Sequence, residues 1–284
     1  MSVVAFSGAA KVGAVLGRPI THSLSPLLHN AWIHALGLDA VYVPLAPQGE
    51  EGFKALIRAC RGGLLCGVNV TAPYKEQALA LSDTAEAEAL AAGSANLLTF
   101  DEEGRVKAQS TDGYGLTQAI REQAPGFDFT ALPAVVLGAG GAARAAVSAL
   151  LAAGVPEVRV VNRTLARAEE LVFAFKSRVT AFDLLHAAQA FSGAGLLVNA
   201  ASGGPLPTLE TLPDGAVVMD MTYRPLMTPL LQSAAARDLR TVDGLAMLIH
   251  QARPSFEALF GVAPPVDVDV RALALEHLAN GSPT

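Results

Sequence analysis

The feature that most constrains the fold is a glycine-rich turn near the middle of the chain, Gly138-Ala139-Gly140-Gly141. A short apolar segment, Ala134–Leu137, precedes it, and a helical pattern, Ala142–Ala153, follows it. Glycines at such a junction permit a sharp strand-to-helix turn and let backbone N–H groups approach a phosphate. The third glycine of the usual GxGxxG pattern is Ala143, so the turn alone is a weak signal. Its position between a strand and a helix predicts a Rossmann-type nucleotide domain.

The segments after the glycine turn continue the alternation of strand and helix. Val158–Val161 is expected to be a second strand and Leu165–Phe175 the helix that follows it. Two further apolar segments, Leu196–Asn199 and Val217–Asp220, have the length and composition of buried strands. Repeated strand–helix units of this size support a Rossmann-type domain with a parallel sheet.

The first third of the chain alternates in the same way, but without a glycine-rich turn. Strands are expected at Val12–Leu16, Val41–Leu45 and Leu64–Val70, with a hairpin of Leu97–Phe100 and Val106–Gln109. Helices are expected at Pro26–Leu36, Glu50–Arg61, Lys75–Ala80, Ala85–Ala92 and, near the end of the chain, Gly244–Phe260 and Val268–Ala279. The pattern favours an α/β fold with a largely parallel sheet covered by helices.

Composition and charge exclude several classes of partner. Of the 284 residues, 51% are hydrophobic, which is enough to bury a sizeable core. The net charge is −6 and basic residues do not cluster, so we expect no nucleic-acid partner. Charges or glycines interrupt the alanine-rich runs before the roughly 18 apolar residues of a membrane helix, and residues 1–10 lack a signal-peptide pattern. We expect a cytoplasmic protein with no membrane association.

The cysteines and histidines do not indicate a metal or redox site. Cys60 and Cys66 have the spacing of neither a CxxC pair nor a zinc motif, so we expect two reduced thiols. His22, His29 and His34 are not spaced as metal ligands with nearby acidic residues. We therefore expect no metal.

Two sets of polar residues carry the chemistry, and the first follows the second strand of the Rossmann-type domain. Asn162-Arg163-Thr164 stands where an NAD-binding domain usually has an acidic residue for the ribose 2′-hydroxyl. Arg167 adds a second cation, while Thr164 is also a suitable N-cap for the following helix. A cation in place of an acid favours NADP, because NADP carries an additional phosphate at this position.

The second set lies outside that domain and combines hydroxyl, amide, amine and carboxylate groups. Its members are Ser23, Ser25, Asn69, Thr71, Lys75, Asn96 and Asp112. Each also has an ordinary structural explanation: Ser25 before Pro26 is a usual helix start, and Asp112-Gly113 is a usual turn. Together they supply the hydrogen-bonding groups and the Lys–Asp pair that a polyhydroxylated ring acid would need.

Ordered motifs from Gly17 to about Phe256 resemble the shikimate dehydrogenase family. The motifs are Gly17–Pro26 (GRPITHSLSP), Asn69–Lys75 (NVTAPYK), Gly93–Asn96 (GSAN), Thr111–Gly113 (TDG), Gly138–Ala142 (GAGGA), Asn162–Thr164 (NRT), Asp220–Tyr223 (DMTY), Asp243–Leu248 (DGLAML) and Gln251. Their order and spacing make this resemblance specific, unlike the glycine turn alone.

The resemblance implies a fold, an activity and a role for each motif. An N-terminal α/β domain of residues 1–112, completed by C-terminal helices of residues 243–284, would bind the substrate, and a Rossmann-type domain of residues 113–242 would bind NADP. The implied activity is the interconversion of 3-dehydroshikimate and shikimate in aromatic amino-acid biosynthesis, with Lys75 and Asp112 as catalytic residues. The implied substrate ligands are Ser23, Ser25, Asn69, Thr71, Asn96, Asp112, Tyr223 and Gln251. The implied cofactor ligands are Gly138, Ala139, Gly140, Gly141, Ala142, Asn162, Arg163, Thr164, Arg167, Met221 and Gly244.

Three positions depart from the usual family pattern. Ser110 replaces an asparagine before Thr-Asp-Gly, and Ala201 replaces a threonine after Asn199-Ala200. Thr222 replaces an aromatic residue before Tyr223. None of these departures removes a proposed catalytic group.

Two alternatives remain open from the sequence. A quinate or quinate/shikimate dehydrogenase that uses NAD would need more room beside Ser23 and Ser25, and Arg163 argues against NAD. A nucleotide-sensing paralogue without turnover would have no need for Lys75 and Asp112. We expect a small ring acid as the substrate and either a monomer or a homodimer.

Overall fold

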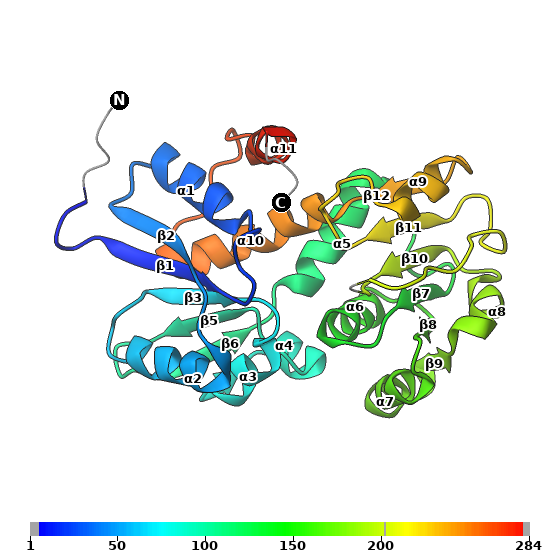
Figure 1. Cartoon of the computed structure of the whole chain (residues 1–284), viewed down its shortest axis with the longest axis horizontal. Helices are drawn as coiled ribbons and strands as arrows, with labels where there is room; N and C mark the ends of the chain where they lie inside the picture. Colours follow the sequence, from blue (N-terminus) through cyan, green and yellow to red (C-terminus); the bar gives the residue numbers. More distant parts are fainter. Residues whose placement is uncertain (1–5, 202, 281–284) are drawn as a thin grey trace. The chain divides into compact units, whose positions relative to one another are not determined.

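The computed structural model describes residues 6–201 and 203–280, which form two compact units (Figure 1). The first unit contains the described residues up to Thr111 and those from Ala252 onward, and the second is Asp112–Gln251. The second unit opens with α5 (Asp112–Gln123), and the helix α10 (Gly244–Phe260) begins in the second unit and ends in the first. Each unit is built around its own sheet.

The first unit has a six-stranded sheet with the order β2-β1-β3-β5-β6-β4. Its strands are β1 (Lys11–Leu16), β2 (Ala40–Leu45), β3 (Gly67–Val70), β4 (Thr84–Ala85), β5 (Leu97–Phe100) and β6 (Val106–Gln109). β1 pairs in parallel with β2 and β3, whereas β5 runs antiparallel to both β3 and β6. Because β4 also runs parallel to β6, three of the five strand pairs are parallel, and the expected largely parallel sheet is confirmed. The expected hairpin of β5 and β6 supplies an antiparallel pair, because a tight turn can join only antiparallel strands.

Helices and an apolar core surround this sheet. The helices are α1 (Ser25–Ala35), α2 (Gly49–Cys60), α3 (Lys75–Ala80), α4 (Ala87–Ala92), α11 (Val270–Asn280) and the second half of α10. Phe53 and Ile57 of α2 are buried against Val68 and Val70 of β3. The apolar side chains of α2 recur at helical spacing and those of β3 lie on one face of the strand, as burial against a sheet requires.

Several predicted boundaries in the first unit differ from the observed ones by one to three residues, and two of these differences have a clear physical reason. The strand expected at Leu64–Val70 begins at Gly67, because Arg61–Leu64 form a turn and Leu64 is exposed. The helix expected at Ala85–Ala92 begins at Ala87, because Thr84 and Ala85 pair with β6 instead.

The second unit has an all-parallel six-stranded sheet with the order β12-β11-β10-β7-β8-β9. Its strands are β7 (Ala134–Leu137), β8 (Val158–Val161), β9 (Val179–Phe182), β10 (Leu196–Asn199), β11 (Val217–Asp220) and β12 (Arg240–Val242). Four of these strands have the bounds predicted from the sequence, and β9 and β12 were not predicted. The Rossmann-type assignment is confirmed.

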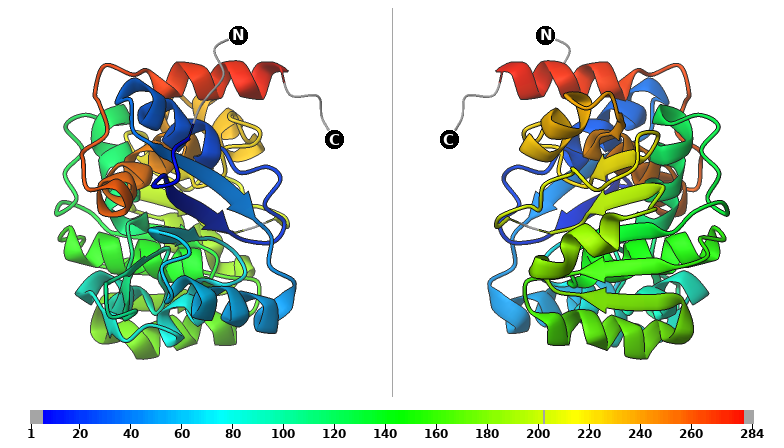
Figure 2. Two further views of the ribbon diagram at one scale, coloured as in Figure 1. Left: turned by 90° about the vertical axis from the view of Figure 1, so that its left-hand side faces the viewer. Right: turned by 90° about the vertical axis from the view of Figure 1, so that its right-hand side faces the viewer.

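Helices cover both faces of this sheet (Figure 2). They are α5, α6 (Gly141–Ala152), α7 (Leu165–Phe175), α8 (Ala187–Phe191), α9 (Pro229–Ala235), the short 3-10 turns η1 (Lys176–Arg178) and η2 (Leu184–His186), and the first half of α10. Val136 and Val198 point into one apolar core, while the neighbouring Val135 and Leu197 point into the other. Both faces are thus apolar, which is why these strands are uninterrupted hydrophobic runs.

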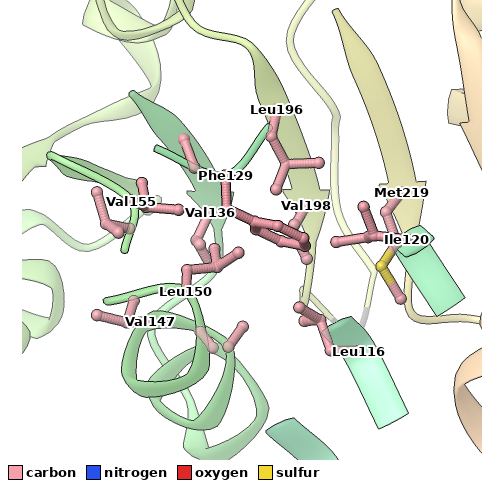
Figure 3. Packing of buried hydrophobic residues seen from close by; sticks show 14 of the residues in the cluster. Leu116, Ile120, Phe129, Val136, Val147, Leu150, Val155, Leu196, Val198 and Met219 are labelled. Carbon is pink, nitrogen blue, oxygen red and sulfur yellow. The ribbon is translucent and has the colours of Figure 1, made fainter. Parts of the chain in front are cut away.

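Figure 3 shows one of these cores, in which α5 and α6 pack against the strands. The labelled residues are Leu116, Ile120, Phe129, Val136, Val147, Leu150, Val155, Leu196, Val198 and Met219.

The structural explanation of Asp112-Gly113 as a turn is wrong, because α5 begins at Asp112. The glycines of this helix have a packing role. A Cβ on Gly113 would lie 2.8 Å from the Ala149 side chain, and a Cβ on Gly115 would lie 2.7 Å from the Met247 carbonyl oxygen. Glycine allows α5 to approach α6 and α10 closely, so its presence here does not mark a chain reversal.

Candidate functional site

A pocket of about 450 Å³ opens at the carboxyl ends of the strands of the second unit. A hollow of about 400 Å³ shares part of its wall and adds Thr164. The pocket is lined by Leu137, Gly138, Ala139, Gly140, Val161, Asn162, Arg163, Arg167, Leu184, Ala200, Ala201, Gly203, Gly204, Pro205, Leu206 and Pro207. The carboxyl edge of a doubly wound sheet is where nucleotide ligands bind.

The glycine turn forms one wall of this pocket. Gly138 has φ +103°, and a Cβ at this position would lie 3.1 Å from the Ala201 nitrogen. Gly140 is the N-cap of α6, and a Cβ there would meet nothing within 4 Å. The turn therefore leaves open space next to the N-terminus of α6, where backbone N–H groups and the helix dipole favour a phosphate.

The turn after β8 contributes polar and cationic side chains to the pocket, whereas the glycine turn contributes backbone groups. The Asn162 Nδ2 atom donates to the Thr164 carbonyl oxygen over 2.8 Å, which closes the turn. Arg163 and Arg167 are exposed and line the pocket. In the described part of the chain no carboxylate lines either hollow. The donors present fit a dinucleotide that carries an additional phosphate on its adenosine ribose.

A buried polar cluster holds the loops that follow β10 and β11. The Asp220 carboxylate is 2% exposed and accepts from Asn199 Nδ2 (3.1 Å), Thr228 Oγ1 (2.7 Å) and the Thr222 N–H (3.0 Å). The Asn199 Oδ1 atom accepts from the Ala201 N–H over 3.2 Å. Two of the departures from the family pattern, Ala201 and Thr222, thus fall where the structure uses the backbone N–H. A changed side chain leaves these hydrogen bonds in place.

Met221 and Gly244, both expected to contact the cofactor, are brought together by the fold. The Met221 N–H donates to the Asn199 carbonyl oxygen over 3.0 Å. A Cβ on Gly244 would clash with the Met221 carbonyl, so glycine is needed where α10 starts. Leu184 and Pro205–Pro207 line the pocket but were not predicted. Leu184 follows β9, and the β-branched stretch Val179–Thr180 is the signal that was missed.

The first unit gathers most of the residues expected to bind the substrate. Ser23 and Ser25 lie at the start of α1, where the Ser23 Oγ atom accepts from the Ser25 N–H over 3.3 Å. The Thr71 N–H donates to the Leu16 carbonyl oxygen over 2.8 Å, which fixes the loop after β3. Lys75 is half-buried at the first position of α3, and its carbonyl oxygen accepts from the Ala95 N–H over 2.9 Å.

Asn96 and Thr111 form a close pair in the same unit. The Asn96 Nδ2 atom donates to Thr111 Oγ1 over 2.9 Å, and the Thr111 N–H donates to Asn96 Oδ1 over 2.8 Å. Both residues are buried, with 3% and 8% of their surfaces exposed. The amide is thereby held in a single orientation.

The other expected substrate residues belong to the second unit. Asp112 is the first residue of α5 and is 7% exposed. Tyr223 is half-buried in the loop after β11. Gln251, also half-buried, donates from Nε2 to the Leu248 carbonyl oxygen over 2.9 Å on α10.

The described residues form neither a reactive cysteine site nor a metal site. Cys60 and Cys66 are free thiols, and burial raises the pKa of each to about 11. Protonated thiols are poor nucleophiles and poor ligands. Within residues 6–201 and 203–280, no three His, Cys, Asp or Glu side chains gather as a metal site requires. None of the helices in these ranges is long and apolar enough to cross a membrane.

A parallel sheet with a glycine turn at a helix N-terminus, in one chain with an α/β unit rich in amides and hydroxyls, is typical of a nucleotide-dependent dehydrogenase. Three family models match this chain. They describe a shikimate dehydrogenase substrate binding domain at residues 15–98, a shikimate / quinate 5-dehydrogenase at residues 120–210 and a shikimate 5′-dehydrogenase C-terminal domain at residues 244–274. The chain belongs to the shikimate dehydrogenase family.

Individual relatives cover almost the whole chain. The shikimate dehydrogenase (NADP(+)) of Caulobacter vibrioides is 53% identical over 280 residues, which are 96% of this chain and 98% of that protein. The shikimate 5-dehydrogenase of Thermus thermophilus in complex with NADP(H) and shikimate is 38% identical, with a TM-score of 0.79 over 90% of this chain and 95% of that one. The quinate dehydrogenase of Corynebacterium glutamicum in complex with NAD is 27% identical, with a TM-score of 0.85 over 94% of this chain and 99% of that one.

Proposed function

We propose that this chain is an NADP-dependent oxidoreductase that interconverts 3-dehydroshikimate and shikimate. The observation that carries the proposal is the pocket after β8, where Arg163 and Arg167 occupy the place of the acidic residue typical of NAD enzymes. The name and the 53% identity of the Caulobacter relative support the same activity. The quinate/NAD alternative is less favoured, because the pocket is cationic.

The cofactor residues divide into three groups by the part of the cofactor site that they would form. The glycine turn would bind the diphosphate through its N–H groups, and Asn162-Arg163-Thr164 with Arg167 would bind the ribose phosphate. Met221 and Gly244 would line the remaining part of the NADP site. The full set is Gly138, Ala139, Gly140, Gly141, Ala142, Asn162, Arg163, Thr164, Arg167, Met221 and Gly244.

Lys75 and Asp112 are proposed as the acid–base pair. Bound NADPH supplies a hydride to the ketone carbon, so negative charge develops on the ketone oxygen and must be neutralised by a proton. Lys75 gives that proton to the oxygen in reduction and takes it back in oxidation. Asp112 orients the amine and a ring hydroxyl. The remaining contacts to the ring acid would come from Ser23, Ser25, Asn69, Thr71, Asn96, Tyr223 and Gln251.

We further propose that residues 1–112 and 243–284 act as the substrate-binding part and residues 113–242 as the NADP-binding part. By contacts alone, residues 243–251 pack with the nucleotide unit. Their proposed role in substrate binding rests on Gln251. We propose a cytoplasmic monomer or homodimer without a nucleic-acid partner.

A substrate panel tests the proposed function. Shikimate and quinate are each assayed with NADP and with NAD, and reduction of the cofactor is followed by absorbance. Shikimate with NADP should give the highest kcat/KM. A higher value for quinate with NAD would favour the alternative dehydrogenase, and nucleotide binding without turnover in all four combinations would favour a sensing protein.

A further inference from the structure

The first unit contains a continuous set of buried hydrogen bonds that includes two of the expected substrate residues, Asn69 and Asn96. The Tyr42 hydroxyl donates to Asn69 Oδ1 over 2.8 Å. The Asn69 Nδ2 atom donates to the Asn96 carbonyl oxygen over 3.1 Å and to Ser255 Oγ over 3.0 Å. Ser255 Oγ lies 3.3 Å from Thr111 Oγ1, which is bonded to the Asn96 side chain. Residues of β2, β3 and α10 are therefore joined to Asn96, just before β5, and to Thr111, just before α5.

Chemistry fixes the direction of both amides in this set. The Asn96 carbonyl oxygen can only accept, so the atom of Asn69 that faces it must be Nδ2. Asn69 Oδ1 then faces Tyr42, whose hydroxyl must be the donor. The Thr111 N–H can only donate, so the atom of Asn96 that faces it must be Oδ1. Each amide has one orientation in which every contact is favourable.

Both Nδ2 hydrogens of Asn69 are used within this unit, by the Asn96 carbonyl and by Ser255. The Asn69 side chain has no further N–H for a substrate hydroxyl. Its Oδ1 atom, which accepts from Tyr42, can still accept a second hydrogen bond from a substrate hydroxyl.

Two residues of the set, Ser255 and Tyr42, are shielded from any ligand. Ser255 is 0% exposed and Tyr42 is 1% exposed. The Tyr42 ring is stacked on His29, with centroids 4.0 Å apart and planes at 9°. A buried donor or acceptor without a partner costs free energy. We therefore expect both hydroxyls to be needed for the hydrogen bonds that they make in this core.

We propose that Ser255 and Tyr42 are positioning residues for substrate binding. Ser255 acts on the Asn96 amide through Thr111 Oγ1, and Tyr42 acts through Asn69, which binds Ser255 Oγ and the Asn96 carbonyl oxygen. The proposal rests on the proposed function, because it takes Asn96 as a ligand of shikimate. Loss of either hydroxyl removes one hydrogen-bond partner of the buried Asn69 amide and breaks the set at that point.

The test compares Ser255→Ala and Tyr42→Phe with the wild type in steady-state kinetics. The KM for shikimate should rise about tenfold in each variant, while the KM for NADP stays unchanged and kcat falls less than the KM rises. Ser255→Thr keeps the hydroxyl and should restore the KM. A merely structural role would lower the melting temperature of both variants and leave the KM for shikimate as it is, which would overturn the proposal.

Matched controls separate positioning from loss of stability. Ser82→Ala removes a serine hydroxyl of the same unit that donates to the Leu79 carbonyl oxygen over 2.7 Å. Its KM for shikimate should equal that of the wild type, and an equal rise in KM in Ser82→Ala would contradict the proposal.

Calorimetric titration with shikimate separates this proposal from the proposed function. A wild type that neither binds nor turns over shikimate overturns both. An active wild type with unchanged shikimate affinity in Ser255→Ala and Tyr42→Phe overturns the positioning role alone. If Ser255→Ala does not fold, Tyr42→Phe decides, because it removes one oxygen and keeps the ring stacked on His29.

Discussion

The two units present their functional side chains in opposite ways. In the nucleotide unit, Arg163, Thr164 and Arg167 are exposed at the rim of the pocket, and the backbone of the glycine turn supplies the remaining donors. In the first unit, Asn69 and Asn96 are buried and joined to other polar side chains by hydrogen bonds. The first arrangement is a set of independent contacts, and the second is a connected network.

This difference predicts how substitutions combine. Contacts that share no partner contribute almost additively to binding, whereas members of one hydrogen-bond network do not. Removing one arginine from the pocket rim leaves its neighbours where they are. Removing one hydroxyl from the network changes the environment of the amides beyond it. The predictions below test this contrast, beginning with the substitution that is expected to cause the largest loss of turnover.

Lys75→Met should cause the largest loss. Without an acid to protonate the developing alkoxide, kcat should fall about 10²–10⁴-fold. The KM for shikimate should change little, because the loss concerns the transition state more than the bound substrate. The measurement is steady-state turnover of shikimate with NADP.

Lys107→Met is the matched control for this lysine. Lys107 lies on β6 of the same unit, where its Nζ atom pairs with Glu86 at 2.6 Å. The control should retain wild-type kinetics. Near wild-type turnover of Lys75→Met would show that another group supplies the proton.

Arg163→Ala should have the next largest effect, confined to one cofactor. A charge-assisted hydrogen bond contributes roughly 1.5–3 kcal/mol, so NADP affinity should fall about tenfold to a hundredfold while NAD affinity barely changes. Because the rim contacts are independent, Arg167→Ala should add its own loss in the double variant. Arg240→Ala, on a strand at the opposite edge of the sheet, is the control. Equal use of NADP and NAD by the wild type would contradict this account of the pocket.

The contrast between the units also explains what the sequence could predict. The strands of the nucleotide unit are continuous apolar runs next to a glycine turn, and four were predicted with the bounds that the structure shows. The motif residues Asn162 and Arg163 are adjacent in sequence and remain adjacent in the pocket. Local patterns are sufficient when a site is built by one strand–turn–helix unit.

The network in the first unit could not be predicted in this way. Asn69 and Ser255 are 186 residues apart in sequence and meet only because the second half of α10 packs in the first unit. No local pattern marks Ser255, which is one serine in the interior of a helix. The glycines of α5 were misleading for a related reason, since their role is contact with distant helices. Whether a particular amide binds a ligand or supports another amide depends on such long-range contacts.

Buried His29 makes the first unit sensitive to acid. Burial lowers the pKa of His29 from 6.5 to about 3, and its Nδ1 atom has no hydrogen-bond partner among the described residues. In the unfolded chain this imidazole takes up a proton as the pH falls below 6.5, whereas in the folded protein it stays neutral until about pH 3. The contribution of His29 to stability is therefore present above pH 6.5 and is lost as the pH falls towards 3.

The smallest predicted effect is the pH dependence of folding that His29 causes. Between about pH 7 and pH 5, the free energy of unfolding should fall by about 2 kcal/mol through this residue. Denaturant unfolding of the wild type and of His29→Gln at both pH values measures it, and the drop should shrink by that amount in the variant. His34→Gln, at an exposed position on the same helix, should keep the wild-type drop. Because His29 stacks on Tyr42, its protonation would also disturb the network, so shikimate affinity should weaken in acid before NADP affinity does. An identical drop in all three proteins would show that the buried histidine is not the group that titrates.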